Sequence, residues 1–558
     1  MSELALETCP ERRRWWSNPI WRRYARSRLR PQALGVGLLL IWISAGFLFF
    51  FTRTLGAYRF KLGVVDAERA PLVPLLVLQA ILLFFVGTGQ VAGGITAEAD
   101  EGTLDYQRLS PMRPLAKVLG YLLGLPLREW CLFGATLPFT AWGLWRGEVG
   151  VGTWLPVYAA LVSSAILYHL TGLVAGTVVK NRRWAFLISL GAVFLLYTVI
   201  PQAAKFGLVF FKYLTLWPVI DENLANLLPR EAGGVWRLAK SFEPEVRFFG
   251  LRFSEAVFTL FSQGVLSLTL GVMLWRRWRR AESHLLGKGW ALGVFGWMQL
   301  VLLGNALPLI EPGLLFPSRQ FSRRYLPKEN WEPAVGEALG MIGLYGLVTL
   351  LLMVVLTVII TPSVETQVRG LRRGHRLGWR RLPWFSDAAS SFPFVVLMAL
   401  VGAAGWTVFA ERLMGSSWFA GHPLGAQAGP TLALVLLGAG LSCQAILEGW
   451  GGRRLFLAAV FAGVVPLLAG GIVGTVGSRS LVSATWLVGL SPVAAPGYAV
   501  ACLLPTVDWP PEVALALPRA FWFWQGLTGL LGCWLLVRLR QIRRARAVAV
   551  AATGRGAV

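Results

Sequence analysis

The residues best suited to do chemistry form an acidic cluster between two apolar stretches. Glu98, Asp100, Glu101 and Asp105 place four carboxylates within eight residues. On a continuous helix, Glu98, Glu101 and Asp105 have the spacing i, i+3 and i+7 and share one face. Such a face can bind basic or amide groups of another protein. Gly102 costs about 1 kcal/mol relative to alanine in a helix, so we expect a bend there or support from a packing partner.

Prolines divide the segment around this cluster. Ser110-Pro111 ends the acidic run, and Pro114 can occupy the first turn of a new helix, where its missing N–H costs nothing. The sequence therefore predicts a short acidic helix within 96–110, presented at a membrane surface. A solvated helix in a loop between two membrane spans would have the same charge pattern.

The order of residues in this segment resembles the coupling helix of type-2 ABC-transporter permeases. That family has a run like E-R-E-x-G-T-L-E-x-L-x-x-[ST]-P after its second span. This chain has Glu98-Ala99-Asp100-Glu101-Gly102-Thr103-Leu104-Asp105 followed by Ser110-Pro111, with Ala99 in place of the basic residue and Gln107-Arg108 in place of an apolar pair. The resemblance implies that a separate ABC ATP-binding subunit docks on this helix. The residues that it assigns to the contact are Glu98, Asp100, Glu101, Gly102, Thr103, Leu104, Asp105 and Pro111.

The composition excludes a water-soluble protein. The chain has 558 residues, of which 55% are hydrophobic and 15% charged. Segments long enough to cross about 30 Å of hydrocarbon recur along it. They lie near 33–52, 71–94, 128–145, 153–179, 184–204, 256–275, 290–309, 338–361, 392–410, 429–447, 455–476 and 518–537. We therefore expect an all-α polytopic protein with about twelve transmembrane helices, multi-pass in the cell membrane of a prokaryote.

The spans are expected to form two six-helix halves, residues 33–280 with the coupling helix and residues 281–558. Each half has a long segment before its sixth span, 205–254 and 477–517, whose apolar pieces are too short to span and are interrupted by prolines. These pieces predict interfacial or re-entrant helices. The family resemblance implies such a layout for 1–280, and for 281–558 the layout alone suggests it.

Residues 1–32 are expected to form a cytosolic segment with a basic interfacial helix. An Asn-Pro pair can cap that helix and fill its first turn. Tryptophan suits the headgroup layer and arginines bind anionic lipid, which we therefore predict as a partner at the cytosolic face. The residues assigned to this helix are Asn18, Pro19, Trp21, Arg22 and Arg23.

The formal net charge of +25 is explained by topology. With both termini in the cytosol, nearly all of the excess Lys and Arg falls in cytosolic loops, as the positive-inside rule requires. A nucleic-acid partner is therefore not needed. The basic loop 362–391 follows the eighth span, in the place that the acidic helix holds in the first half. It either fixes the topology or makes a second contact with the ATPase.

Motifs for catalysis or ion coupling are missing from the sequence. No G-x-x-x-x-G-K-[ST] run occurs, and the four histidines do not cluster with carboxylates at metal-ligand spacing. The predicted spans contain almost no carboxylates, which argues against proton- or sodium-driven exchange. His169, inside a predicted span, either is functional or makes a helix-to-helix hydrogen bond. We expect no cofactor, no metal and no enzymatic activity in this chain, with ATP and Mg on the partner subunit.

The function expected from these features is that of a permease subunit of an ABC transporter, acting in export. A second permease subunit or a second copy of the chain could complete the translocation unit. Two alternatives remain open. One is a membrane-embedded lipid or glycan transferase using Asp221-Glu222 or Asp508, and the other is a scaffold that transports nothing.

Overall fold

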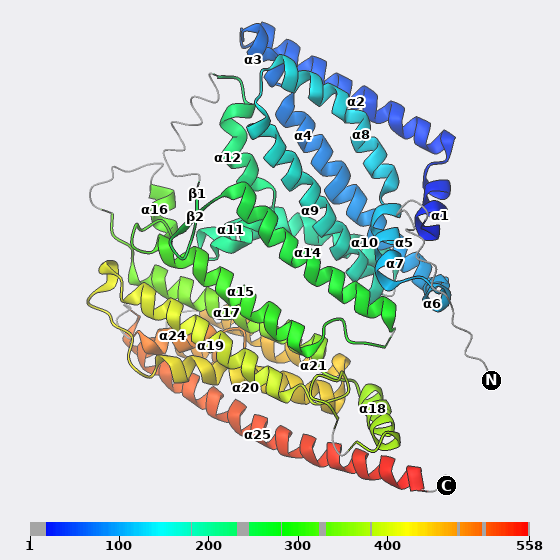
Figure 1. The fold of residues 1–558 in the computed structure, drawn as a ribbon. Helices are drawn as coiled ribbons and strands as arrows, with labels where there is room; N and C mark the ends of the chain where they lie inside the picture. The colour runs from blue at the N-terminus through cyan, green and yellow to red at the C-terminus, as the bar shows by residue number, and fades with distance from the viewer. Residues whose placement is uncertain are drawn as a thin grey trace, which may run out of the picture. The chain divides into compact units, whose positions relative to one another are not determined.

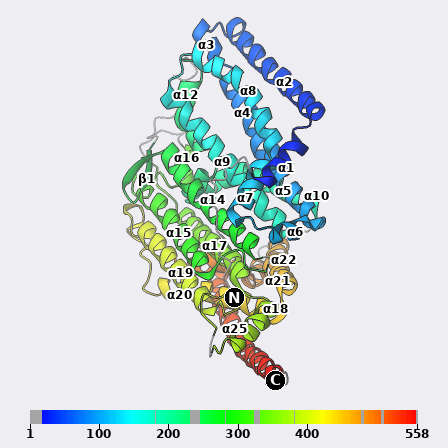
Figure 2. The same ribbon diagram turned by 45° about the vertical axis from the view of Figure 1, so that its right-hand side comes forward.

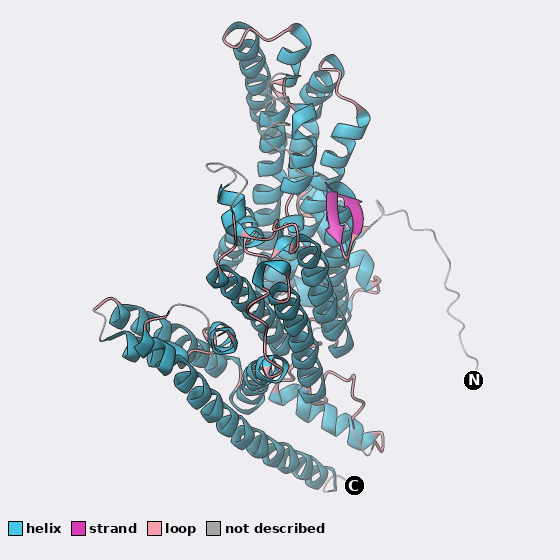
Figure 3. Cartoon of the chain, turned by 90° about the vertical axis from the view of Figure 1, so that its left-hand side faces the viewer, coloured by secondary structure: helices cyan, strands magenta, loops and turns pink. Residues whose placement is uncertain are grey.

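The structure is a computed structural model that describes residues 18–179, 181–230, 245–280, 282–322, 331–379, 382–476, 480–504 and 509–555. Over these ranges the chain is almost entirely helical, and Figure 3 shows its one pair of strands in magenta. Eleven helices of the described chain are long and apolar enough to cross a membrane. The predicted all-α polytopic membrane fold is therefore confirmed.

The chain divides into two compact units. Unit 1 consists of residues 1–199, 212–245 and 254–281, and unit 2 consists of residues 200–211, 246–253 and 282–558. The predicted division into two six-span halves, 33–280 and 281–558, stays a prediction. Two short pieces of the predicted first half belong to unit 2.

Unit 1 is built around α9, which packs against α5, α12 and α14. The segments α3, α4, η2 and α5 follow one another directly and together form one apolar stretch, Val64–Asp100, long enough to span. The helices of this unit are α1 (Pro19–Arg28), α2 (Pro31–Tyr58), α3 (Val64–Arg69), α4 (Leu72–Ala80), the π-helix η2 (Ile81–Gly87), α5 (Thr88–Asp100), α6 (Thr103–Leu109), α7 (Pro114–Gly124), α8 (Leu127–Arg146), α9 (Val151–Val178), α10 (Arg182–Thr198), α12 (Trp217–Leu227) and α14 (Glu255–Arg279) (Figure 1).

The third predicted span differs from the prediction. It corresponds to α8, a helix of 20 residues that packs against α2. The eleven apolar helices do not include it. Arg128 and Glu129 lie in its first turn and Arg146 is its last residue, so the uncharged stretch between them is shorter than the helix itself.

Unit 2 is a second helical bundle, in which α20 packs against α19 and α25, and α17 packs against α24. Its elements are α11 (Ile200–Lys205), β1 (Glu245–Phe248), β2 (Leu251–Ser254), α15 (Lys288–Ala306), η4 (Leu307–Leu309), α16 (Pro317–Ser322), α17 (Val335–Ile360), α18 (Val364–Arg376), α19 (Phe392–Met414), η6 (Ser417–Phe419), α20 (Ala428–Trp450), α21 (Gly452–Ala458), η7 (Ala459–Val464), α22 (Val465–Gly474), α23 (Leu481–Gly489), α24 (Ala495–Leu503) and α25 (Pro511–Arg555). The 3₁₀ helix η3 (Val209–Leu214) has residues in both units, and so do the two strands, since Glu245 and Ser254 belong to unit 1.

The segments predicted to hold short helices do so. α12 has 11 residues, and α23 and α24 have nine each, which is too short to cross hydrocarbon. Re-entry of these helices into the membrane remains a prediction. The sequence prediction missed the β1–β2 hairpin, whose turn has positive φ at Phe249 (48°) and Gly250 (89°).

In both π-helices of the described ranges, a backbone carbonyl oxygen bonds to a side chain from another helix or loop. In η2, the carbonyl oxygen of Leu83 lies 3.0 Å from Nε2 of His169 on α9. In η7, the hydroxyl of Ser491 donates to the carbonyl oxygen of Gly463 at 2.6 Å. The wider i→i+5 turn leaves carbonyls without their usual helical partner, so a polar side chain can satisfy them. His169 therefore makes a helix-to-helix hydrogen bond, one of the two roles left open for it.

Candidate functional site

The acidic segment 96–110 does not form one continuous helix. α5 ends at Asp100, and α6 begins at Thr103 after Gly102, whose φ of 70° and ψ of 1° lie in the left-handed region. A residue with a Cβ is disfavoured there, which explains the glycine. The expected bend at Gly102 is confirmed. The prediction that Glu98, Glu101 and Asp105 share one helical face was wrong, because the bend redirects the chain between them.

Glu98 is not part of an exposed acidic face, and this corrects its predicted role in docking. Glu98 lies in the last turn of α5 and is only 4% exposed. Its carboxylate forms an ion pair with Arg23 and accepts hydrogen bonds from the hydroxyls of Tyr24 and Tyr121. Arg23 and Tyr24 belong to α1 and Tyr121 to α7. Glu98 therefore ties three helices together.

The surroundings of Glu98 compensate for its burial. A buried carboxylate is costly unless it is ion-paired and hydrogen-bonded, and here one guanidinium and two phenols face it. Burial and the carboxylate itself raise the pKa of Tyr24 and of Tyr121 well above the usual range of tyrosine. Both phenols therefore stay protonated at physiological pH and remain donors.

α1 lies directly on α7, as Figure 2 shows. Asn18 caps α1 by accepting from the N–H of Ile20 at 3.0 Å, and its Nδ2 donates to the carbonyl oxygen of Ala116 at 2.6 Å. Pro19 fills the first turn, so the predicted helix start is confirmed. The two glycines of α7 permit the contact, since a Cβ at Gly120 would lie 2.9 Å from Asn18 Nδ2 and one at Gly124 would lie 3.0 Å from Tyr24 Cβ.

The predicted interfacial residues of α1 have different surroundings. Trp21 is half-buried, and Arg22 is exposed. Arg23 is also exposed, but its guanidinium is engaged by Glu98. A lipid contact of this helix remains a prediction, and Arg23 has a structural role that the sequence did not indicate. Residues 1–17 of the predicted N-terminal segment lie outside the described residues.

Lys117 fixes the far end of α6 to α7. It is only 2% exposed, and its Nζ donates to the carbonyl oxygens of Gln107 at 2.7 Å, Ser110 at 3.0 Å and Arg108 at 3.3 Å. These are carbonyls at the end of a helix, which have no partner within the helix itself. The sequence prediction missed Lys117. The signal that could have found it is a lysine within the otherwise apolar stretch 114–124.

Aromatic contacts join α6 and α7 to α14. The ring of Tyr121 stacks on that of Trp278 in α14, with centroids 5.0 Å apart. The guanidinium of Arg108 in α6 lies 6.0 Å from the Trp278 ring centroid. α14 in turn packs along α9. A contiguous set of contacts therefore runs from α6 into the long helices of unit 1.

The outward surface of this bend is acidic and apolar together. Asp100, Glu101 and Asp105 are exposed, and so are the large side chains of Tyr106 (77%) and Leu109 (85%). We call these five residues the acidic corner. Of the other residues assigned from the sequence, Pro111 is exposed, Thr103 is half-buried, and Leu104 is buried and packs in the core below α6. Two exposed apolar side chains beside three carboxylates can form a docking surface.

The basic loop 362–391 contains a helix, α18, which the sequence prediction did not describe. Ser363 caps it by accepting from the N–H of Thr366 at 3.3 Å. Arg369 pairs with Glu282 and lies 3.8 Å from Glu365. The helix is basic, whereas the corresponding place in unit 1, the bend between α5 and α6, has the acidic corner.

The alternative transferase site was predicted at Asp221-Glu222 or at Asp508. Asp221 and Glu222 lie on α12, and Glu222 accepts from the N–H of Ala256 at 3.3 Å in the first turn of α14. Asp508 lies outside the described residues. In the described ranges, no group of three His, Cys, Asp or Glu side chains is arranged to hold a metal ion.

No protein-family model matches this chain, and no match to it is found among curated proteins or among solved structures. A functional assignment therefore depends on the geometry described above and on the residues of the segment 98–111.

Proposed function

We propose that this chain is the permease subunit of an ABC transporter, driven by a separate ATP-binding subunit that docks on the acidic corner. The observation that carries the proposal is the combination of an exposed acidic and apolar tip with anchors on both sides of it. Glu98 holds the end of α5, and Lys117 holds the end of α6. The resemblance to type-2 permeases at 98–111 supports the same assignment.

The anchors suit the corner to transmit movement. A partner that pushes on α6 also displaces α7, because Lys117 bonds three carbonyls at the end of α6. Tyr121 and Trp278 then carry the displacement to α14. Closure of an ATPase dimer on ATP would thus tilt the spans between inward-open and outward-open states.

The chemistry of the corner indicates what its partner presents. Asp100 and Glu101 would pair with basic or amide groups of the partner, and so would Asp105, which also pairs with Arg108 within α6. Such pairs orient a complex and speed its association. Tyr106 and Leu109 would fill an apolar cleft and supply most of the affinity, since buried aromatic anchors dominate many interfaces. ATP and Mg would be held by that partner.

The proposed orientation rests on the charge distribution. We place both termini and the acidic corner in the cytosol of a prokaryotic cell, because that arrangement puts the excess Lys and Arg inside. The substrate would leave the cell through a path formed by this chain, alone or with a second permease subunit or a second copy.

Co-purification tests this proposal. The tagged full chain is extracted from its native membranes in mild detergent, and its companions are identified by mass spectrometry. We expect a protein with a P-loop, and we expect Glu101→Lys/Asp105→Lys to release it. Glu332→Lys/Glu411→Lys reverses two exposed carboxylates elsewhere and should retain it. If the wild-type chain recovers no ATP-binding protein, or if the corner variant retains it fully, the assignment fails.

A further inference from the structure

Unit 2 has a pocket of about 310 Å³ between α18, the segment 382–394 and α25. Its lining is mainly apolar and includes Leu371, Trp384 and Phe394. Two arginines of α25, Arg543 and Arg546, also line it. A cavity that combines an apolar wall with guanidinium groups fits an amphipathic anion.

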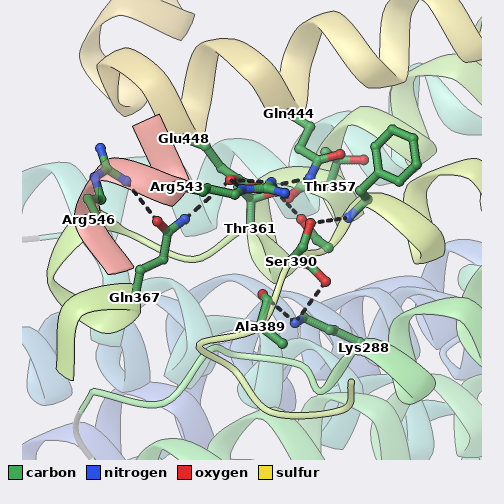
Figure 4. Close-up of polar contacts among 12 residues, drawn as sticks. Lys288, Thr357, Thr361, Gln367, Ala389, Ser390, Gln444, Glu448, Arg543 and Arg546 are labelled. Atoms are coloured by element: carbon green, nitrogen blue, oxygen red, sulfur yellow. Dashed lines mark hydrogen bonds and ion pairs between the residues drawn. The ribbon is translucent and has the colours of Figure 1, made fainter. Parts of the chain in front are cut away.

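The two arginines differ in the charge of their hydrogen-bond partners (Figure 4). Arg543 donates through Nε to the buried carboxylate of Glu448 at 2.8 Å. Arg546 donates through Nη1 to the neutral amide oxygen of Gln367 at 2.7 Å, and no carboxylate of the described chain lies within ion-pairing distance of it. That bond uses one of the five N–H donors of a guanidinium, so others remain for a phosphate.

Close packing shapes the wall of the pocket. A Cβ at Gly370 of α18 would lie 2.1 Å from Ala388 Cβ, and one at Gly374 would lie 3.2 Å from Leu382 Cδ2. The buried Lys288 holds the same segment through its backbone. Its Nζ donates to the carbonyl oxygens of Ser386 at 2.7 Å, Ala389 at 2.6 Å and Ser390 at 3.3 Å. The pocket is therefore built into the fold.

The pocket lies where a membrane span begins. α19 starts at Phe392, and its 23 residues are apolar enough to span. Trp384 and Phe385 are 66% and 70% exposed just before that start. Aromatic side chains of this kind concentrate at the level of lipid headgroups. The exposed arginines of α18, such as Arg372, Arg373 and Arg376, add positive charge at the same level.

From these observations we infer that the pocket binds one anionic phospholipid. The phosphodiester accepts hydrogen bonds from Arg546, and the start of an acyl chain lies against Leu371, Trp384 and Phe394. The bound lipid thereby joins α18 to α25 in unit 2. This site is separate from the acidic corner, so its existence does not depend on the proposed transport function.

Native mass spectrometry of the full chain in neutral detergent tests the inference. Phosphatidylglycerol, phosphatidylcholine and sn-glycerol 3-phosphate are titrated separately. We expect one phosphatidylglycerol to bind most tightly, and Arg546→Gln to weaken its binding about tenfold through loss of a charged hydrogen bond. Arg544→Gln removes an exposed charge from the same helix outside the pocket and should leave affinity within about twofold.

A second variant keeps the test decisive if Arg546→Gln does not fold. Trp384→Ala removes an exposed side chain from the wall of the pocket and should also weaken the binding of phosphatidylglycerol. Equal binding of phosphatidylcholine would overturn the inference, because the site would then not select an anionic headgroup. Equal binding of sn-glycerol 3-phosphate would also overturn it, because the site would then not bind an acyl chain. An equal effect of Arg544→Gln would assign the binding to diffuse surface charge. If Arg546→Gln released a co-purifying ATP-binding protein and left lipid affinity unchanged, the pocket would belong to a protein contact.

Discussion

Arg23 of α1 forms an ion pair with Glu98, the buried carboxylate at the end of α5. This pair ties α1 and α7 to the end of α5 next to the acidic corner, because Tyr24 and Tyr121 bind the same carboxylate. Glu98 and Glu101 are only three residues apart, yet one holds the structure together and the other is exposed. Their replacement should therefore have different consequences.

Reversal of Glu98 should destabilise unit 1. Glu98→Lys would bury a second positive charge beside Arg23 and leave the Tyr24 hydroxyl without its acceptor, whereas the Tyr121 hydroxyl would keep Oε1 of Gln107. Breaking a buried ion pair costs about 3 kcal/mol or more, at the low end here because Arg23 is half exposed. We expect a lower apparent melting temperature and a lower yield, measured by fluorescence-detected size-exclusion chromatography. Glu101→Lys, with an exposed side chain, should behave as wild type, and an equal loss in both variants would contradict the assigned roles.

Removal of the Lys117 ammonium should loosen α6 and leave the spans intact. Lys117→Met keeps the volume of the side chain but leaves the carbonyls of Gln107, Arg108 and Ser110 without their donor. We expect backbone amide exchange over 103–110 to increase about tenfold or more, since each lost charged hydrogen bond contributes about 1.5 kcal/mol. Hydrogen–deuterium exchange with mass spectrometry measures this. Arg113→Met, at the exposed start of α7, is the matched control.

The same pair of variants separates anchoring from docking. If Lys117→Met leaves exchange over 103–110 unchanged, α6 is held by other contacts, and the proposed route from α6 to α7 is wrong. If exchange increases while ATPase-coupled transport stays normal, transport does not require the end of α6 to be fixed by Lys117.

The sequence was sufficient for the fold class and for several local features. Apolar segments of span length and the cap-forming Asn18-Pro19 pair depend on short-range patterns, and the structure has both. The break at Gly102 was also predictable, because glycine is costly in a helix interior. These features are set by residues that are neighbours along the chain.

The arrangement of the site was not predictable in the same way. The burial of Glu98 depends on Arg23 and Tyr24, 75 and 74 positions earlier in the chain. The bonds of Lys117 depend on how α7 returns past α6. Charge spacing alone could not tell an exposed carboxylate from a buried one, because the helix bends between them and places them on different surfaces.

The apolar members of the acidic corner should supply more of the partner affinity than its charges. Tyr106→Ala/Leu109→Ala removes two strongly exposed side chains and should weaken binding of the proposed ATP-binding subunit by about 2 kcal/mol, or about thirtyfold. Retention of that subunit on the immobilised chain, measured against its concentration, gives the change. Tyr58→Ala removes another tyrosine, 83% exposed at the end of α2, and should have no effect. A uniform effect of all three substitutions would indicate loss of fold and not of an interface.

Gly102 offers a test of the bend itself. Its φ of 70° is unfavourable for a residue with a Cβ, but a Cβ there would meet no atom within 4 Å. Gly102→Ala should therefore cost about 1 kcal/mol through the backbone alone, and Gly102→Asn should cost less because asparagine adopts the left-handed region more readily. We expect amide exchange over 103–109 to be fastest in the alanine variant, slower in the asparagine variant and slowest in the wild type. An alanine variant that exchanges as slowly as wild type would show that the left-handed bend is not required for α6 to form, and the orientation of the acidic corner would then need another cause.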